Sequence, residues 1–321
     1  MKYNPIFIGF CLSAGLPAPV LAQSDARHAP CTLQALAEVD MQTLPDGRVV
    51  IPVKIDGHDY RFMIDTGGAG NTVESQVAKR EAIETHEGSV FVGVGNNIMS
   101  DIIHAGDFAI GELHGKNYVF HVDKNDTLLW DGTLTPPVLA AFDVDIDFAH
   151  EKFKLFSPNH CPGGVVYWTD GPVAVVPMDL SLDGHIQVPV RIDGKTITAD
   201  IDTGSVGSVL SLRQAWQYLD VDEKSAGMKS LGNTIMNGMR TPAYSYPFAA
   251  MTFGEGTTGS IAVNHPRIEI LPDQTMRGMQ GLVLGVSVLR QLHMYIAYKE
   301  RKLYLSAPLA GLTPKAEPQG K

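Results

Sequence analysis

The chain has 321 residues, 44% of them apolar and 19% charged, a balance typical of a globular protein that buries a core. Its net charge of −10 argues against nucleic acid and anionic membrane surfaces as partners. The length suggests two domains of about 150 residues each. The 32 glycines and 20 prolines favour a turn-rich β protein over a helical one.

The first 22 residues have the pattern of a secretory signal peptide. Lys2 gives a short positive start, and a mostly apolar run extends from residue 6 to residue 16. Val20 and Ala22 then stand at the −3 and −1 positions of a cleavage site. The apolar run is too short for a membrane anchor, and two prolines follow it. We therefore expect residues 1–22 to be removed and the mature chain to be periplasmic or secreted, with no attachment to a membrane.

Two cysteines, Cys31 and Cys161, remain after removal of the signal peptide. Export places them in an oxidising compartment, and they flank a single unit of about 130 residues. We expect a disulfide between them that joins the first and last strands of this unit. The alternative is a pair of unrelated buried thiols.

Taken in chain order, short β-rich segments bounded by glycine or aspartate predict strands. Helices are expected over residues 74–81, 136–140, 212–219 and 286–292, and β-hairpins over 142–155 and 292–305. The polar residues 313–321 are expected to be a disordered tail. The strands are expected over residues 49–55, 60–64, 89–94, 118–122, 173–176, 186–192, 197–201 and 261–263.

An internal repeat at an offset of 137 residues organises the chain. Residues 52–57 (PVKIDG) recur as residues 189–194 (PVRIDG), and Ile-Asp-Thr-Gly at 64–67 recurs at 201–204. Ten of the nineteen residues from Pro52 to Gly70 are identical to their partners. Such self-similarity implies two structural units of similar shape. We assign them to residues 23–162 and 163–312.

The two Asp-Thr-Gly segments each follow an apolar strand. If the two units pack about a pseudo-two-fold axis, Asp65 and Asp202 meet at that axis. Two carboxylates in contact share one proton, because both cannot ionise without a large energetic cost. The charged partner can take a proton from a water molecule while the protonated partner donates to a carbonyl oxygen. A peptide bond would then be hydrolysed without a covalent intermediate or a metal ion.

Residues beside the two aspartates suit supporting roles. The hydroxyls of Thr66 and Thr203 can hydrogen-bond backbone across the axis, and Gly67 and Gly204 let backbone N–H groups approach the carboxylates closely. Ser205 follows the second segment, and its hydroxyl could bind the outer oxygen of Asp202. That bond would make Asp202 the more readily ionised partner.

This pattern resembles the pepsin-like and retropepsin-like aspartic proteases in their single-chain form, and more narrowly the secreted bacterial aspartyl proteases. The resemblance runs from Cys31 to about Leu305. It implies an all-β, two-lobed acid-protease fold with pseudo-two-fold symmetry and a few short helices. The implied activity is that of an exported aspartic endopeptidase that acts on peptide or protein substrates without a cofactor or metal. The internal duplication supplies both aspartates, so a monomer suffices.

The family carries an apolar-apolar-Gly motif late in each lobe. Val283-Leu284-Gly285 matches it, but the first lobe has Thr133-Leu134-Thr135. Thr135 adds volume and a hydroxyl to a tight core. This departure sustains an alternative from another class, a binding or scaffold protein that keeps the lobes and has lost proteolysis.

Substrate-covering hairpin tips are expected at residues that include Gly93, Val94 and Gly95 in the first lobe, and Ile235 and Met236 in the second. The eleven histidines show no compact metal-ligand spacing. Three clustered acids alternate with apolar residues, and we assign them to the solvent face of a strand; they are Asp143, Asp145 and Asp147.

Overall fold

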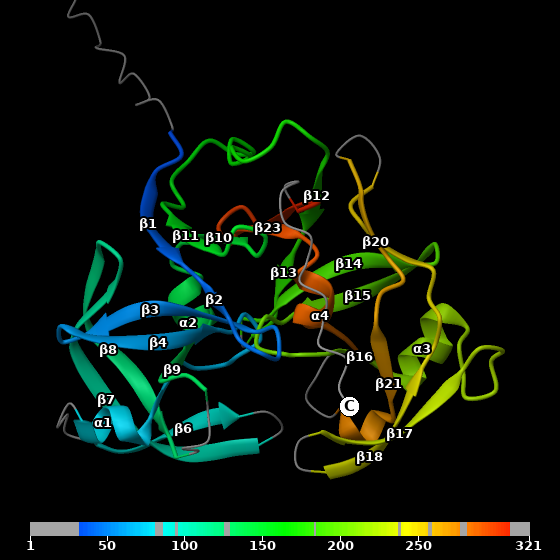
Figure 1. Cartoon of the computed structure of the whole chain (residues 1–321), viewed down its shortest axis with the longest axis horizontal. Coiled ribbons are helices and arrows are strands. Elements are labelled where there is room, and N and C mark those ends of the chain that lie inside the picture. Colours follow the sequence, from blue (N-terminus) through cyan, green and yellow to red (C-terminus); the bar gives the residue numbers. More distant parts are fainter. Residues whose placement is uncertain are drawn as a thin grey trace, which may run out of the picture. The chain divides into compact units, whose positions relative to one another are not determined.

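The chain folds mainly into β-strands, which assemble into three sheets in the computed structural model (Figure 1). Among the described residues, no helix is both long enough and apolar enough to cross a membrane. Residues from Thr32 onward form one unit. The structure describes residues 32–80, 86–93, 96–124, 129–182, 184–236, 239–255, 259–276 and 281–308.

Several sequence predictions fall outside the described residues. They concern the signal peptide, the tail at 313–321, Val94, Gly95 and Cys31. Cys161 is described. Because Cys31 is not described, the pairing of these two cysteines stays a prediction.

The first repeat forms an eight-stranded sheet. Its central hairpin, β3 (Val49–Ile55) and β4 (His58–Ile64), alternates buried and exposed residues and turns through Asp56 and Gly57 at φ 49° and 89°. Positive φ at both turn residues matches the twist of the paired strands, so this turn favours the hairpin. The remaining strands are β2 (Gln42–Thr43), β5 (Thr72–Glu74), β6 (His86–Gly93), β7 (Asn96–Ile110), β8 (Leu113–Asp123) and β9 (Gly132–Leu134).

The second repeat forms a ten-stranded sheet around the equivalent hairpin of β14 (Ile186–Ile192) and β15 (Lys195–Ile201). Its turn residues, Asp193 and Gly194, have φ of 48° and 83°, as in the first repeat. The other strands are β13 (Asp179–Leu180), β16 (Ser208–Ser211), β17 (Lys229–Met236), β18 (Met239–Ser245), β19 (Ala250–Phe253), β20 (Ile261–Asn264), β21 (Ile268–Leu271) and β22 (Leu282–Leu284).

Short helices lie where the sequence predicts them. Ser211 caps the longest, because its hydroxyl accepts a hydrogen bond from the Gln214 backbone N–H. The helices are α1 (Ser75–Arg80), α2 (Pro136–Leu139), α3 (Leu212–Leu219) and α4 (Val286–Leu289), and a 3₁₀ turn covers Asp273–Thr275.

A third sheet contains strands from both repeats. The two predicted hairpins meet in it, with β10 antiparallel to β23, so that Val144 faces Ile296 and Asp147 faces His293. The predicted division between residues 162 and 163 into two lobes stays a prediction. The strand order is β1 (Ala35–Asp40), β11 (Lys152–Phe156), β10 (Asp143–Asp147), β23 (His293–Ala297), β24 (Lys302–Ser306) and β12 (Val173–Pro177).

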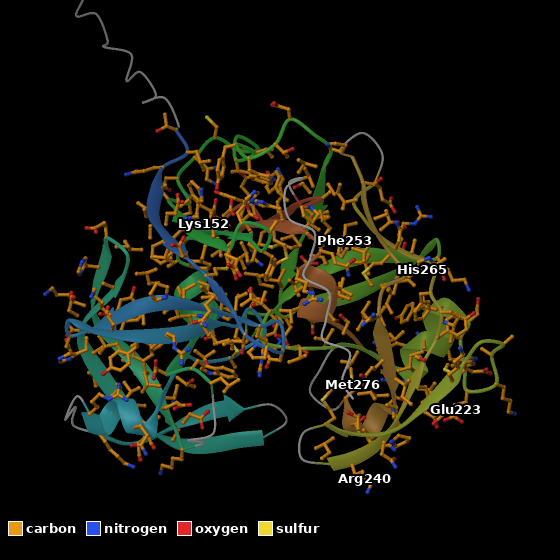
Figure 2. The ribbon with its side chains drawn as sticks, viewed as in Figure 1. Lys152, Glu223, Arg240, Phe253, His265 and Met276 are labelled. Atoms are coloured by element: carbon orange, nitrogen blue, oxygen red, sulfur yellow. The ribbon has the colours of Figure 1, made fainter. Side chains whose placement is uncertain are left out.

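The hydrophobic core is built from the inward faces of these sheets. Residues equivalent by the repeat are buried alike, for example Ile64 and Ile201 at the ends of β4 and β15. Phe253 of β19, labelled in Figure 2, is completely buried. Because the strands leading to both Asp-Thr-Gly segments end in this core, the two segments start from fixed positions.

The prediction of a solvent face for the three acids of β10 is wrong. Asp143 and Asp145 are completely buried, and Asp147 is 7% exposed. Histidines lie against them, His160 Nε2 at 2.5 Å from Asp143 Oδ2 and His293 Nε2 at 3.0 Å from Asp145 Oδ1. We call these five residues the carboxylate–histidine cluster. Their burial is possible because the imidazoles lie beside the carboxylates.

Candidate active site

Each Asp-Thr-Gly segment begins where a buried strand ends. The backbone N–H of Asp65 donates to Leu134 O at 2.9 Å, and that of Asp202 donates to Leu284 O at 3.0 Å. In both halves the acceptor belongs to a strand that runs parallel to the one ending in isoleucine. The two segments are therefore held by equivalent backbone contacts.

Thr66 and Thr203 join the two segments through reciprocal hydrogen bonds. The Thr66 hydroxyl donates to Ile201 O at 2.7 Å, and the Thr203 hydroxyl donates to Ile64 O at 2.8 Å. Each hydroxyl also accepts the backbone N–H of the other threonine at 3.1 Å. Both side chains are fully buried, so these bonds lie out of water. The predicted cross-axis contacts are present.

The carboxylates are held by backbone donors, as expected from the glycines. Gly67 N–H donates to Asp65 Oδ1 and Gly204 N–H donates to Asp202 Oδ1, both at 2.9 Å. A Cβ atom on Gly67 would lie 2.4 Å from Asp202 Cγ, and one on Gly204 would lie 2.4 Å from Asp65 Cγ. Each carboxyl group therefore packs on the glycine of the other segment, which brings the two aspartates together.

The environment separates the two aspartates in acidity. Burial raises the pKa of Asp65 well above its ordinary value, and the charge of Asp202 raises it further. Burial also raises the pKa of Asp202, but a hydrogen bond from Asp65 and the N–H groups of Gly204 and Ser205 oppose that rise. Both pKa values are therefore raised, that of Asp65 more strongly, because two buried carboxyl groups face each other.

The predicted bond from the Ser205 hydroxyl to Asp202 is wrong. This hydroxyl donates to Gly207 O at 2.9 Å, which fixes the turn instead. The backbone N–H of Ser205 binds Asp202 Oδ1 at 3.0 Å. That Asp202 is the more readily ionised partner stays a prediction, because each carboxyl group receives hydrogen bonds from two backbone N–H groups.

Thr135 is accommodated by a residue that sequence analysis missed. The Thr135 N–H and hydroxyl both donate to Asn71 Oδ1, at 2.9 and 3.1 Å. In the second half the Gly285 N–H donates to Ser208 Oγ at 3.1 Å. Asn71 and Ser208 are separated by the repeat offset of 137. Aligning the two halves beyond their identical residues could have identified this paired difference.

The predicted hairpin tips lie on paired strands. Gly93 ends β6 opposite Asn96, and Val94 and Gly95 lie outside the described residues. In the second half, Ile235 pairs with Arg240 and is 76% exposed, whereas Met236 packs against a buried apolar cluster. A role of these residues in substrate binding stays a prediction.

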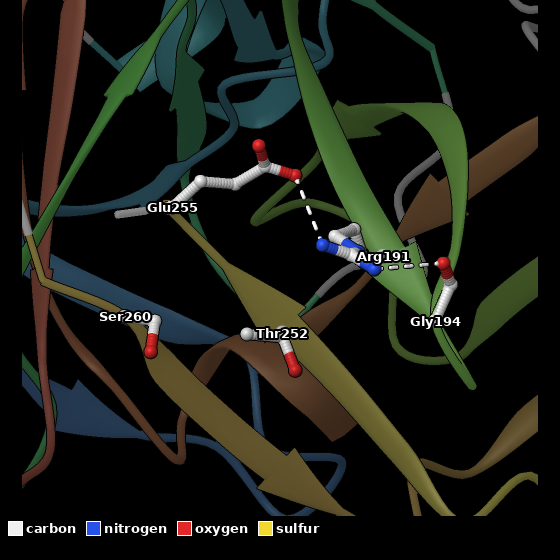
Figure 3. Close-up of a pocket in the computed structure, with 6 residues that line it drawn as sticks. Arg191, Gly194, Thr252, Glu255 and Ser260 are labelled. Carbon is white, nitrogen blue, oxygen red and sulfur yellow. Dashed lines mark hydrogen bonds and ion pairs between the residues drawn. The ribbon is translucent and has the colours of Figure 1, made fainter.

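A surface pocket lies beside the turn between β14 and β15 and the end of β19 (Figure 3). Arg191 in this pocket is 3.4 Å from Glu255 and donates to Gly194 O at 3.0 Å. The Arg191 guanidinium therefore already has a carboxylate and a backbone carbonyl as partners. The pocket is lined by Arg191, Gly194, Thr252, Gly254, Glu255 and Ser260.

Comparison with known proteins agrees with this geometry. Residues 51–135, which contain the first Asp-Thr-Gly segment, match the model of an aspartyl protease family. No curated protein gives a significant match. The crystal structure of basic 7S globulin from soybean is similar, with a TM-score of 0.50 at 13% identity over 86% of this chain and 95% of that chain. The chain therefore has an all-β fold like that of aspartic-protease-like proteins.

Proposed function

We propose that the chain is an exported aspartic endopeptidase that hydrolyses peptide bonds in peptide or protein substrates. The observation that carries this proposal is the reciprocal packing of Asp65 and Asp202, each against the glycine of the other segment. The match of residues 51–135 to an aspartyl protease family supports it. The signal-like N-terminus and the cysteine pair support a periplasmic or secreted location.

The proposed mechanism uses the two protonation states of the pair. Ionised Asp202 takes a proton from a water molecule, and the water oxygen attacks the peptide carbonyl carbon. Asp65 donates its proton to the carbonyl oxygen as the tetrahedral species forms. As that species collapses and the C–N bond breaks, Asp202 gives the proton it took from water to the leaving amine nitrogen. Asp65 regains a proton from a hydroxyl of the tetrahedral species, which becomes the product carboxyl group, so the pair returns to its starting state. Thr66 and Thr203 keep the two carboxyl groups in the geometry that this sequence of steps requires.

The alternative function is peptide binding or scaffolding without proteolysis. It rests on Thr135 in place of glycine. Asn71 accepts both donors of Thr135, which is only 1% exposed. The substitution therefore fits this half of the molecule, and the argument for lost catalysis is weakened.

The test is cleavage of a broad peptide library from about pH 3 to 8 by the wild type, Asp65→Asn, Asp202→Asn and the double variant. Each single variant should lose nearly all activity, and the double variant should be little worse, because the carboxyls act as a unit. Both single variants should remain folded, as measured by circular dichroism, since asparagine is nearly isosteric with aspartate.

Wild-type activity should fall on the alkaline side as Asp65 loses the shared proton. A folded wild type that cleaves nothing, or an Asp65→Asn variant with wild-type activity, would rule the protease function out. Binding of library peptides without cleavage would favour the alternative.

A further inference from the structure

Each aspartate begins a turn that faces the start of a short helix. We call residues 65–70 the first aspartate turn and residues 202–207 the second aspartate turn. In the second half, Val286 N–H donates to Ser205 O at 2.9 Å, and the next N–H of helix α4 donates to Val206 O at 3.1 Å. These two backbone bonds hold the second aspartate turn against the helix.

The first half cannot form the equivalent bonds. Helix α2 begins with Pro136 and Pro137, and proline has no backbone N–H to donate. The N–H groups of the next two residues, Val138 and Leu139, both bind Thr135 O at 3.0 Å. The four residues of helix α2 therefore leave no backbone donor for the first aspartate turn.

The side chain of Thr135 contacts the first aspartate turn instead. A Cβ atom on Gly68 would lie 2.6 Å from Thr135 Cγ2 and 2.8 Å from Asp65 Oδ2. The threonine methyl group and the outer part of the carboxyl group therefore lie at the same face of Gly68, which is open because glycine has no side chain. Thr135 is 1% exposed, so this contact is shielded from solvent.

Asn71 fixes the direction of the Thr135 methyl group. The hydroxyl and the N–H of Thr135 both donate to Asn71 Oδ1, at 3.1 and 2.9 Å, and Asn71 is itself buried. Since the hydroxyl points to Asn71, the methyl group on the same Cβ must take another staggered direction, which is toward Gly68. Thr135 thus holds the turn at Gly68 within it and at Asn71 directly after it.

The second half has the converse arrangement. Residue 285 is glycine there, and a Cβ atom on Gly285 would lie 2.6 Å from Ser205 O. The backbone of the second aspartate turn therefore occupies the space that the Thr135 side chain takes in the first half. Each half thus supports its turn in one of two ways, by backbone bonds from the helix or by a side chain at the residue that precedes it.

We propose that Thr135 is a positioning residue for Asp65: its side chain supports the first aspartate turn in place of the two backbone bonds that the prolines of helix α2 cannot form. The proposal rests on the proposed function. It assigns a role in the candidate active site to the residue that departs from the glycine of the family motif. Thr135 acts on Asp65 through Gly68.

The test is Thr135→Gly, which gives the first half the residue of the second half while both prolines remain. Asp65 should then be held poorly, so kcat should fall about tenfold with KM unchanged, because positioning of the reacting groups counts in the transition state. Amide hydrogen exchange of residues 65–70, measured by NMR, should become about tenfold faster. Adding Pro136→Val and Pro137→Ser to Thr135→Gly supplies the two missing N–H groups and should restore both quantities.

Two further variants serve as controls. Pro136→Val with Pro137→Ser in the presence of Thr135 should keep kcat and the exchange rates near those of the wild type. Thr135→Ser keeps both bonds to Asn71 and loses only the methyl group, so it should show the same changes as Thr135→Gly at smaller size. If Thr135→Gly does not fold, Thr135→Ser decides the outcome.

The exchange measurement does not require peptide cleavage, so it separates this proposal from the proposed function. Unchanged exchange in Thr135→Gly and Thr135→Ser would overturn the role of Thr135. Faster exchange with an unchanged kcat, or faster exchange that the proline replacements do not reverse, would overturn it as well. If the wild type cleaves nothing but the exchange rates rise and are restored as expected, the proposed function fails and the support of the turn by Thr135 stands.

Discussion

The aspartate pair depends on the absence of side chains as well as on the carboxyl groups. Gly67 and Gly204 each pack on the carboxyl group of the other half, at a distance that no Cβ atom tolerates. Their backbone N–H groups simultaneously bind the carboxylates of their own half. The same two residues therefore set the separation of the aspartates and the orientation of each one.

Gly67→Ala should disrupt the pair without removing a titratable group. The new Cβ atom would lie 2.4 Å from Asp202 Cγ and 2.7 Å from both of its oxygens, so the carboxyl must move. A displacement of about 1 Å at a reacting group costs on the order of 100-fold in rate. We expect that loss in kcat/KM, together with a stability loss of about 1–3 kcal/mol in urea unfolding.

Gly207→Ala is the matched control, because a Cβ atom there has no neighbour within 4 Å. It should retain near wild-type kcat/KM. Equal losses in Gly67→Ala and Gly207→Ala would show that the segment tolerates no side chain at all. The specific contact between Gly67 and Asp202 would then not be the cause.

At the scale of secondary-structure elements, the two halves support their aspartate segments with different residue pairs. Thr135 and Asn71 form one pair, and Gly285 and Ser208 form the other. In each pair a side-chain oxygen accepts the backbone N–H that begins a short helix. The longer asparagine reaches its donor in the half that carries threonine. Each pair is therefore a matched unit.

Gly285→Ala should be far more destabilising than Thr135→Ala. A Cβ atom on Gly285 would lie 2.3 Å from Gly207 O and 2.6 Å from Ser205 O, and both are backbone atoms that cannot rotate away. We expect a loss of about 3 kcal/mol in the free energy of unfolding, at the upper end of overpacking effects. Thr135→Ala removes one hydroxyl bond and should cost about 1 kcal/mol. Urea unfolding of the two variants measures the difference in their free energies of unfolding. Similar losses in the two variants would contradict the interpretation that each half is built around its own residue pair.

Local sequence pattern predicted several elements with their observed bounds. The strands at 49–55 and 186–192 and the helix at 212–219 agree with β3, β14 and α3. They could be predicted because the repeat, the β-rich composition and the apolar spacing agreed there. The long strand β7, Asn96–Ile110, was missed because its polar and apolar residues follow no strict period of two.

The burial of a strand face by residues distant in sequence could not be predicted from local pattern. The alternation of Asp143, Asp145 and Asp147 with apolar residues is typical of a strand with one solvent-exposed face. In the structure, Tyr167 and His160 from a later segment lie on that face, with the Tyr167 hydroxyl 2.7 Å from Asp145 Oδ2. The aspartates of the candidate site could be predicted because the sequence repeat shows that Asp65 and Asp202 occupy equivalent positions in the two halves.

At the scale of the whole molecule, the carboxylate–histidine cluster joins the two repeats inside their shared sheet. His293 of β23 lies 3.0 Å from Asp145 Oδ1 and 3.5 Å from Asp147 Oδ2 on β10. The Trp168 ring stacks on the imidazole, with centroids 4.6 Å apart and an interplanar angle of 1°. Trp168 Nε1–H is in turn bonded to Ser306 Oγ at 3.0 Å. The cluster thus connects β10, β23, β24 and the segment before β12.

The pKa shifts in this cluster define a pH window for stability. Burial alone would lower the pKa of His293, but Asp145 and Asp147 raise it to about 9. Its contribution is therefore complete below about 6.5 and is lost as the pH rises through about 9. Burial would raise the pKa of Asp147, but His293 and His150 hold it well below its ordinary value. Its contribution is present above about 4 and is lost on strong acidification.

The combined contribution of His293 and Asp147 to stability should therefore be largest between about pH 4 and 6.5, on the acid side of neutrality. The free energy of unfolding of the wild type should lose about 3 kcal/mol from His293 between pH 6.5 and 10, the range over which this residue loses its proton. Urea unfolding at several pH values measures this dependence of stability on pH.

His293→Gln should be less stable at pH 5 and should lose the fall in stability between pH 6.5 and 10. His150→Gln is the matched control, because His150 contacts the same Asp147 from a more exposed position, and it should keep this fall. If the free energy of unfolding of His293→Gln still falls between pH 6.5 and 10, another group causes the loss of stability at alkaline pH. The carboxylate–histidine cluster would then not be its origin.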